Sequence, residues 1–116
     1  MSTVVYGIKN CNTIKKVLIW LEAKNQPFSF HDYRKNGINQ NMLKKFIKEL
    51  GWERLVNKQG TIFRALSKEQ KNNLNEFNAI ALMLIQPTII KRPVLEHEGH
   101  YYLGFKLDEY AVIFGE

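Results

Sequence analysis

The sequence begins with a hydrophobic stretch that leads directly into the only cysteine of the chain. Val4 to Tyr6 is typical of a short buried strand, Gly7 to Asn10 of a turn, and the residues from Cys11 onwards of a helix. A cysteine at a helix N-terminus lies beside unpaired N–H groups and the positive end of the helix dipole, and both favour the reactive thiolate. The sequence therefore predicts a reactive thiol at Cys11. The alternative is a buried, inert cysteine.

Positive charge is concentrated around this cysteine. Lys9 lies just before it, and Lys15 and Lys16 follow at the start of the predicted helix, where Asp or Glu is the usual choice. Helix stability alone does not favour lysines there, whereas an anion does: the thiolate itself, an oxyanion substrate, or the carboxylates of a small thiol such as glutathione. We therefore expect Lys9 and Lys15 to stabilise the thiolate or to bind an anionic substrate.

Asn12 and Thr13 follow the cysteine directly. Their backbone N–H groups, and the hydroxyl of Thr13, are placed to donate hydrogen bonds to the sulfur or to an oxyanion. A threonine at this position serves equally well as a helix cap. Both residues join the predicted substrate-binding set.

The overall composition limits the possible architectures and partners. A chain of 116 residues with 45% hydrophobic residues is long enough for one ordinary core. The net charge of +6 allows anionic partners, but 11 acidic residues are mixed among the 17 basic ones, so nucleic-acid binding is not indicated. One cysteine forms no internal disulfide, the N-terminus leaves no room for a signal peptide, and no apolar run approaches the roughly 20 residues of a membrane span. We expect a cytoplasmic protein without a membrane segment.

The hydrophobic pattern divides the rest of the chain into short elements. It predicts a helix over 11–24, a strand over 28–32, a loop over 34–37, and a second helix capped by Asn39 and ended by Gly51. A helical turn over 52–56, a loop over 57–61, a helix over 68–75 with a capping box that begins at Ser67, and a helix over 79–86 follow. Strands over 94–97 and 101–105, joined by a turn at 98–99, and a helix over 107–114 complete the chain.

This order is βαβ, then a block of helices, then ββα. A strand-helix-strand opening favours parallel pairing with a right-handed crossover. Without the block, the order matches an α/β fold with a thioredoxin-like mixed sheet, in which the strand-to-helix junction at Cys11 holds the reactive thiol. We expect a single domain over 1–116, with a thioredoxin-like core over about 1–36 and 88–116 and an inserted helical subdomain over about 37–87.

Four segments resemble the ArsC/Spx family and specifically its YffB-like branch, and the similarity runs essentially end to end, from Val4 to Phe114. They are YGIKNCNTIKK (6–16), FHDYRKNG (30–37), IALMLIQP (80–87) and IIKRPV (89–94). The resemblance implies a thioredoxin-like sheet with a helical insert, a nucleophilic Cys11, an anion-binding Arg92 and a cis proline at Pro93. Such a proline would turn backbone groups toward the thiol in place of a continuing strand.

The sequence also departs from the family's arsenate reductases. Gly7 stands where they have a histidine, and Ile8, Lys9 and Asn12 also differ from their cysteine loop. Two further family arginines that hold arsenate are replaced, one by Asn57 and one at or near residues 105–106. Lysines or arginines nearby could restore positive charge, but a lysine does not reproduce the planar, bidentate grip of arginine. The candidates are Lys58, Arg64 and Lys106.

Regulators of the Spx type bind RNA polymerase and often carry two cysteines separated by two residues. Ile14 occupies the second of these positions here, so an internal disulfide switch is excluded. The three histidines, His31, His97 and His100, share no metal-ligand spacing, and we expect neither a metal nor a bound cofactor.

Together these observations predict a cytosolic thiol-dependent oxidoreductase that uses Cys11 as nucleophile and Arg92 as anion-binding residue. Because the chain has no resolving cysteine, turnover requires an external thiol, so glutathione is the expected co-substrate and glutathione or a glutaredoxin the expected partner. The substrate is expected to be a small anion or thiol. One alternative is an arsenate reductase that uses glutathione or glutaredoxin. Another is a non-catalytic, Spx-like regulator that binds RNA polymerase.

Overall fold

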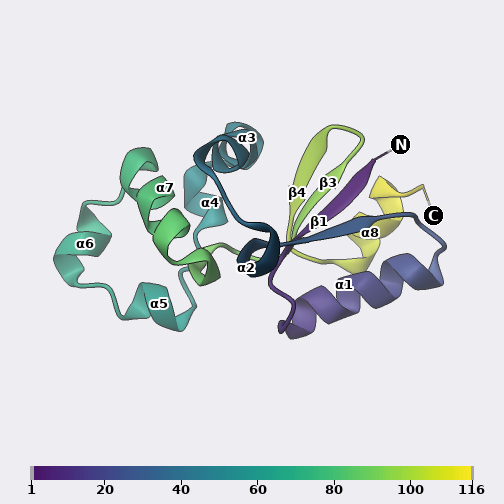
Figure 1. Cartoon of the computed structure of the whole chain (residues 1–116), viewed down its shortest axis with the longest axis horizontal. Helices are drawn as coiled ribbons and strands as arrows, with labels where there is room; N and C mark the ends of the chain where they lie inside the picture. The colour runs from purple at the N-terminus through teal and green to yellow at the C-terminus, as the bar shows by residue number, and fades with distance from the viewer. Residues whose placement is uncertain (1, 116) are drawn as a thin grey trace. The chain divides into compact units, whose positions relative to one another are not determined.

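The computed structural model describes residues 2–115, which form two compact units (Figure 1). The first unit combines the chain up to Asn36 with the chain from Arg92 onwards, and the second is Gly37–Lys91. The second unit ends at Lys91 rather than at residue 87. The reason is that Ile90 forms a β-bridge with Val56, and the N–H of Lys91 donates to the carbonyl of Leu55.

The first unit contains a mixed sheet of four strands in the order β2-β1-β3-β4. Its elements are β1 (Thr3–Gly7), α1 (Asn12–Ala23), β2 (Ser29–Asp32), α2 (Tyr33–Asn36), β3 (Val94–His97), β4 (His100–Leu103) and α8 (Leu107–Ile113). β1 runs parallel to β2, which it reaches through α1, and β3 is antiparallel to both β1 and β4. This arrangement confirms the α/β fold and the thioredoxin-like βαβ…ββα order.

One face of this sheet is covered by α1 and α8, which lie on the same side of it (Figure 1). The core between them is fully buried, and each large apolar side chain in such a position contributes about 1.5–3 kcal/mol. It consists of Val5, Leu95, Ile14, Val17, Leu21 and Tyr110. Since successive side chains of a strand alternate, the side chain after Val5 points to the opposite face, where the hydroxyl of Tyr6 donates to Glu96. The sheet therefore has one apolar and one partly polar face.

The turn between β3 and β4 is formed by Glu98 and Gly99. Both have positive φ angles, 53° and 80°, as a two-residue turn of type I′ requires. β4 ends at Leu103 rather than at residue 105, because Gly104, with φ 86°, turns the chain and donates its N–H to the carbonyl of Pro93. This releases Phe105 from the strand.

The second unit is helical. It contains α3 (Gln40–Leu50), α4 (Trp52–Leu55), α5 (Thr61–Arg64), α6 (Lys68–Asn72), α7 (Glu76–Ile85) and the 3₁₀ helix η1 (Pro87–Ile89). Asn39 caps α3 by accepting from the N–H of Met42, and Gly51, with φ 84°, ends it, as the sequence predicts. None of the helices within residues 2–115 combines the length and apolar character that a membrane span requires.

One predicted loop contains a helical turn instead, and another is one residue shorter than predicted. Residues 34–37 were expected to be a loop, but α2 forms there because the carboxylate of Asp32 accepts from the N–H of Arg34, and the side chain of Asn36 accepts from the N–H of Asp32. The expected loop over 57–61 ends at Gly60, and Thr61 already belongs to α5.

The boundary between α6 and α7 also differs from the prediction. α6 ends at Asn72 rather than at residue 75, and α7 begins at Glu76 rather than at residue 79. The cause is Asn75, whose side chain accepts from the N–H of Asn78 and caps α7. The capping box of Ser67 and Gln70 is confirmed.

Replacing Asn75 with alanine should lower the free energy of unfolding by about 1 kcal/mol, because the first turn of α7 loses its side-chain cap. Chemical denaturation measures this loss. Asn72→Ala is the matched control, since Asn72 is exposed at the end of α6 and caps no helix. An equal effect of both substitutions would contradict the assigned cap.

Candidate active site

Cys11 is the N-cap residue of α1. Its backbone is extended, with φ −130° and ψ 127°, and its carbonyl accepts the first helical hydrogen bond from the N–H of Lys15 at 3.0 Å. The side chain is half-buried against the core of the first unit. The predicted start of the helix beside the cysteine is therefore confirmed, and the sulfur lies where the free N–H groups of the first turn can act on it.

The surroundings of the sulfur favour its ionised form. Burial raises the pKa of the Cys11 thiol, but the N–H of Ile14, a hydrogen bond from Arg92, the N–H of Thr13 and the charge of Arg92 together lower that pKa below its ordinary value. The Cys11 side chain makes no helix-cap hydrogen bond in the structure. The N–H groups of Thr13 and Ile14 lower the pKa because they stabilise the charged thiolate form. The site stabilises the form of cysteine that attacks other atoms.

The positive charge that acts on the sulfur is that of Arg92, the first residue of the second segment of the first unit. Lys9 and Lys15, the residues that the sequence suggested first, are exposed. Asn12 is exposed as well, and the N–H groups that act on the sulfur belong to the two residues after it. Sequence reasoning missed Ile14, although an N-cap side chain ordinarily meets the second and third N–H groups of its helix.

Arg92 and Pro93 are joined by a cis peptide bond, as the family resemblance implies. Arg92 is half-buried and Pro93 is buried. The carbonyl of Pro93 accepts from the N–H of Gly104, which ties this segment to the end of β4. The arginine side chain is thus presented from a backbone that is itself held in place.

Gly7, at the end of β1, leaves room for two residues of the site. A Cβ atom at this position would overlap the end of the Ile14 side chain, and it would lie 3.0 Å from Cγ1 of Ile14 and 3.9 Å from Cδ of Arg92. Ile14 is fully buried, so it cannot easily move away. The isoleucine that stands in place of a second cysteine therefore fills the space that a side chain at position 7 would need.

A row of aromatic side chains lies at the ends of β1 and β2. The ring of His31 is 5.2 Å from that of Tyr6 and 6.1 Å from that of Tyr33. Tyr33 is buried, its hydroxyl has no hydrogen-bond partner among residues 2–115, and its ionisation is coupled to the charge of Arg92. Burial raises the pKa of Tyr33, so this phenol stays neutral. His31 lies in this row as a packing residue.

Other polar residues from the sequence analysis have local roles. The side chain of Asn57 accepts from the N–H of Gln59 and so holds its own loop. His97 lies 2.7 Å from the hydroxyl of Thr3. Within the described chain, no group of three His, Cys, Asp or Glu side chains is arranged to hold a metal ion.

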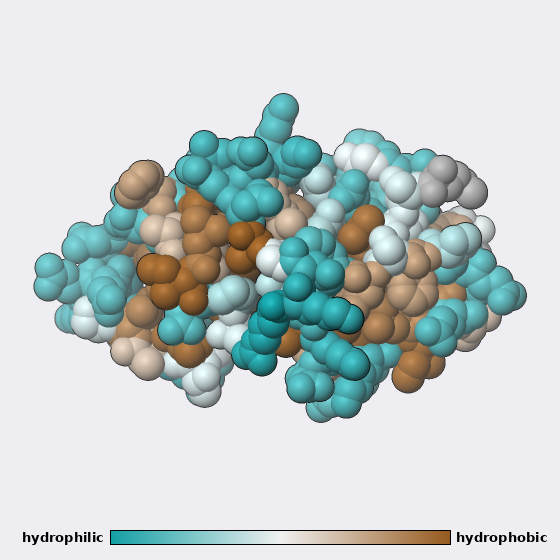
Figure 2. All heavy atoms as spheres, in the orientation of Figure 1, coloured by the Kyte–Doolittle hydropathy of each residue, from teal (hydrophilic) through white to brown (hydrophobic). Residues whose placement is uncertain are grey.

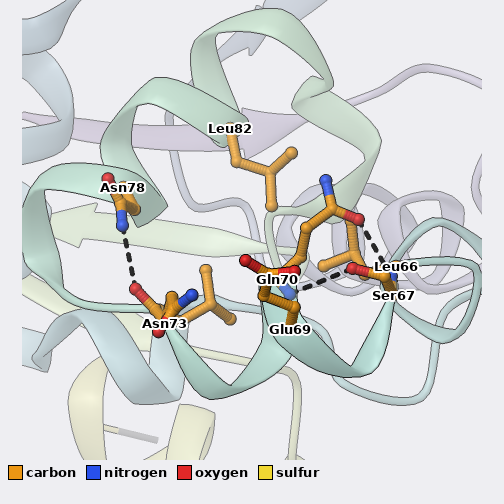
Figure 3. Close-up of a pocket in the computed structure, with 8 residues that line it drawn as sticks. Leu66, Ser67, Glu69, Gln70, Asn73, Asn78 and Leu82 are labelled. Atoms are coloured by element: carbon orange, nitrogen blue, oxygen red, sulfur yellow. Dashed lines mark hydrogen bonds between the residues drawn. The ribbon is translucent and has the colours of Figure 1, made fainter.

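The helical unit has a pocket of its own, of about 470 Å³, between α6 and α7 (Figure 3). Three of its polar side chains, those of Ser67, Gln70 and Asn78, form local hydrogen bonds. Ser67 and Gln70 bond each other's backbone, and the side chain of Asn78 donates to the carbonyl of Asn73. The pocket therefore presents capping groups rather than a reactive side chain.

Comparison with known proteins identifies the family. The model of the ArsC family matches residues 6–113. This chain belongs to the ArsC family. The cysteine and arginine described above thus lie in the fold of a family of thiol oxidoreductases.

Solved structures and curated sequences agree with this assignment. The structure of a YffB protein has 46% identity and a TM-score of 0.91, with 97% of this chain and 98% of that chain covered. An arsenate reductase (ArsC) related protein from Brucella melitensis has 45% identity and a TM-score of 0.82, with 100% and 97% covered. An uncharacterised protein of Haemophilus influenzae is 42% identical over 110 residues, 95% of this chain and 96% of its own.

A more distant relative has a regulatory name. The global transcriptional regulator Spx 1 of Lactococcus lactis is 25% identical over 108 residues, which covers 90% of this chain and 83% of the regulator. This ArsC-family chain is thus more similar to the YffB protein than to that regulator.

Arg92→Gln should move the pH dependence of Cys11 alkylation to higher pH. The substitution removes a charge that lowers the pKa of the thiol, so less thiolate is present at neutral pH and alkylation becomes slower there. Stopped-flow alkylation across pH measures the shift. Lys24→Gln, at the far end of α1, is the control, and Lys15→Gln tests the residue that the sequence suggested. A larger shift for Lys15→Gln than for Arg92→Gln would contradict the assignment.

Gly7→Ala should destabilise the protein by about 1–3 kcal/mol, because the new methyl group overpacks the core against Ile14. Ile14→Val alone should cost about 0.5–1.5 kcal/mol. Combined, the two changes should cost less than their sum, since the valine lacks the carbon that the new methyl group meets. Denaturant unfolding of the four proteins gives this coupling. Strict additivity would show that the two residues do not compete for space.

Proposed function

We propose that this protein is a cytoplasmic, glutathione-linked thiol-disulfide oxidoreductase. Cys11 is its nucleophile, and Arg92 holds the anionic part of the substrate beside the sulfur. The observation that carries the proposal is the convergence of two N–H groups and the Arg92 side chain on one sulfur, in a chain of the ArsC family. An activated thiol that is accessible at a helix N-terminus is suited to attack on a disulfide.

In the first step, the Cys11 thiolate attacks the glutathione sulfur of a mixed disulfide. A new disulfide forms between Cys11 and glutathione, the original disulfide breaks, and the substrate leaves as a thiolate that takes a proton from water. Lowering the pKa of Cys11 raises the fraction of thiolate that is available for this attack.

In the second step, an external thiol must release the enzyme, because Ile14 stands where a resolving cysteine would be and the chain has only one cysteine. The thiolate of a second glutathione attacks the glutathione sulfur on Cys11, which leaves as a thiolate together with glutathione disulfide. A glutaredoxin could supply the same thiol. Glutathione is therefore a co-substrate of this proposal, and no bound cofactor is needed.

The remaining residues of the proposed site bind the anionic ends of glutathione. Lys9 and Lys15 are exposed near the start of α1, where carboxylates are attracted by lysine charge and by the helix N-terminus. Asn12 and Thr13 offer backbone N–H groups at the same end. Pro93 orients the backbone beside Arg92.

Arsenate reduction is the second candidate. The similarity to the Brucella protein, which is described as arsenate reductase related, and the pairing of Cys11 with Arg92 favour it. However, Gly7 replaces the family's histidine, and the side chain of Asn57 is occupied by its own loop. A regulator that binds RNA polymerase is favoured by the Spx relative alone.

Turnover in a coupled assay tests these candidates. The purified protein is mixed with glutathione, glutathione reductase, NADPH and the mixed disulfide of cysteine and glutathione. NADPH consumption is expected, Cys11→Ser should abolish it, and Arg92→Ala should weaken glutathione binding by about 1.5–3 kcal/mol. Lys24→Gln is the control that should leave the rate unchanged.

A parallel reaction contains arsenate in place of the mixed disulfide. NADPH consumption with arsenate but not with the mixed disulfide would favour arsenate reduction and contradict the proposed function. No consumption with either substrate would contradict both enzymatic functions and leave the regulator as the supported alternative.

A further inference from the structure

A surface groove of about 590 Å³ lies within the first unit, along one side of α1 and beside the connection from β4 to α8. The helix contributes side chains spaced so that they share one face. Its wall from α1 consists of Thr13, Lys16, Ile19, Trp20 and Ala23. Phe105, the residue that Gly104 releases from β4, and Leu107 also line it. Of these residues, only Thr13 also belongs to the site around Cys11, to which it contributes its N–H group.

The groove has a fixed aromatic floor and an exposed aliphatic rim. Trp20 and Phe105 both pack edge-on against the buried ring of Tyr110, with ring centroids 5.6 Å and 4.7 Å away. At the rim, Ile19 and Leu107 are 66% and 61% exposed. Two large aliphatic side chains in water beside a fixed apolar floor are typical of a binding groove.

One end of the groove lies beside the residues that hold the reactive thiol. Thr13 lines its end, and the N–H of the same residue stabilises the Cys11 thiolate. Cys11 and Phe105 also pack against the same core. A molecule attached to the substrate sulfur therefore has the Thr13 end of the groove beside it.

The length and chemistry of the groove favour a peptide over glutathione. From Thr13 to Ala23, α1 rises about 15 Å, which corresponds to about four or five residues of extended chain. Glutathione has no apolar side chain that would fill a floor of tryptophan and phenylalanine. Among residues 2–115, Lys16 is the charged residue that lines the groove and no carboxylate lines it, so an acidic residue beside apolar ones is complementary.

We propose that this groove binds an apolar, acidic peptide segment next to the disulfide cysteine of a protein, so that the substrate is a glutathionylated protein. The inference rests on the proposed function and specifies its substrate class. In the exchange step, Cys11 attacks the glutathione sulfur, the protein cysteine leaves as a thiolate and is protonated by water, and the protein's neighbouring residues occupy the groove. Glutathione then releases Cys11 as described above.

Two glutathionylated peptides test the groove in the coupled assay. Both carry an aspartate, and after the cysteine one has leucine and phenylalanine where the other has serine and glycine. The apolar peptide should have a kcat/KM about tenfold higher, since burial of even one large apolar group is worth that much. Ile19→Ser should remove this preference without changing turnover of the cysteine-glutathione mixed disulfide. Val112→Ser is the matched control, because Val112 is 82% exposed on α8 and lies outside the groove.

Binding without chemistry is measured separately, by NMR of the full-length Cys11→Ser protein with the apolar peptide carrying serine for cysteine. Amide shifts should concentrate at Thr13, Lys16 and Ala23 and be absent from α6. Turnover of the small disulfide with equal rates for both peptides would overturn the groove and leave the proposed function standing. Absence of all turnover would overturn the proposed function. In that case, amide shifts along α1 on addition of the peptide would still support peptide binding in the groove, and their absence would overturn it.

Discussion

The reactivity of the Cys11 sulfur depends on four stabilising influences: two N–H groups of α1, and the hydrogen bond and charge of Arg92. Burial opposes them, because a half-buried thiolate is less well solvated than an exposed one. The net effect on the pKa is a lowering, so the favourable groups exceed the burial cost. This balance depends on the fold, because the first unit brings Arg92 of its second segment to the sulfur of its first segment.

The packing of Gly7 against Ile14 explains how two departures from related proteins are compatible with a preserved thiol site. A side chain at Gly7 would enter the space of Ile14 and approach Arg92. Because Ile14 leaves Cys11 as the only cysteine, the function proposed above requires an external thiol to release an adduct on Cys11. The apolar groove that starts at Thr13 then gives the attacked molecule a surface along α1.

A second exposed apolar surface lies over α7, on which Phe77 and Ile85 are 77% and 76% exposed (Figure 2).

The sequence predicted those helix caps and helix ends that depend only on neighbouring residues. Four of these features depend on groups only a few residues apart: the caps at Asn39 and Ser67, the helix end at Gly51 and the helix start at Cys11. The end of β4 at Gly104 depends on a backbone hydrogen bond to Pro93. The unit boundary at Lys91 depends on a backbone hydrogen bond to Leu55. Both partners are distant in the sequence, so the residue pattern alone could not place these boundaries. The contact of Arg92 with the sulfur is of the same long-range kind, and only the family resemblance pointed to it. The N–H of Ile14 could have been found from cap geometry.

The most direct test is the ultraviolet absorbance of the thiolate as a function of pH. Since Cys11 is the only cysteine, the curve reports one group, and Cys11→Ser supplies the blank. The same protein unfolded in urea gives the reference. We expect the folded protein to reach half-ionisation at a lower pH than the unfolded chain. Half-ionisation at the same or a higher pH in the folded protein would show that burial exceeds the stabilising groups, and it would contradict the account.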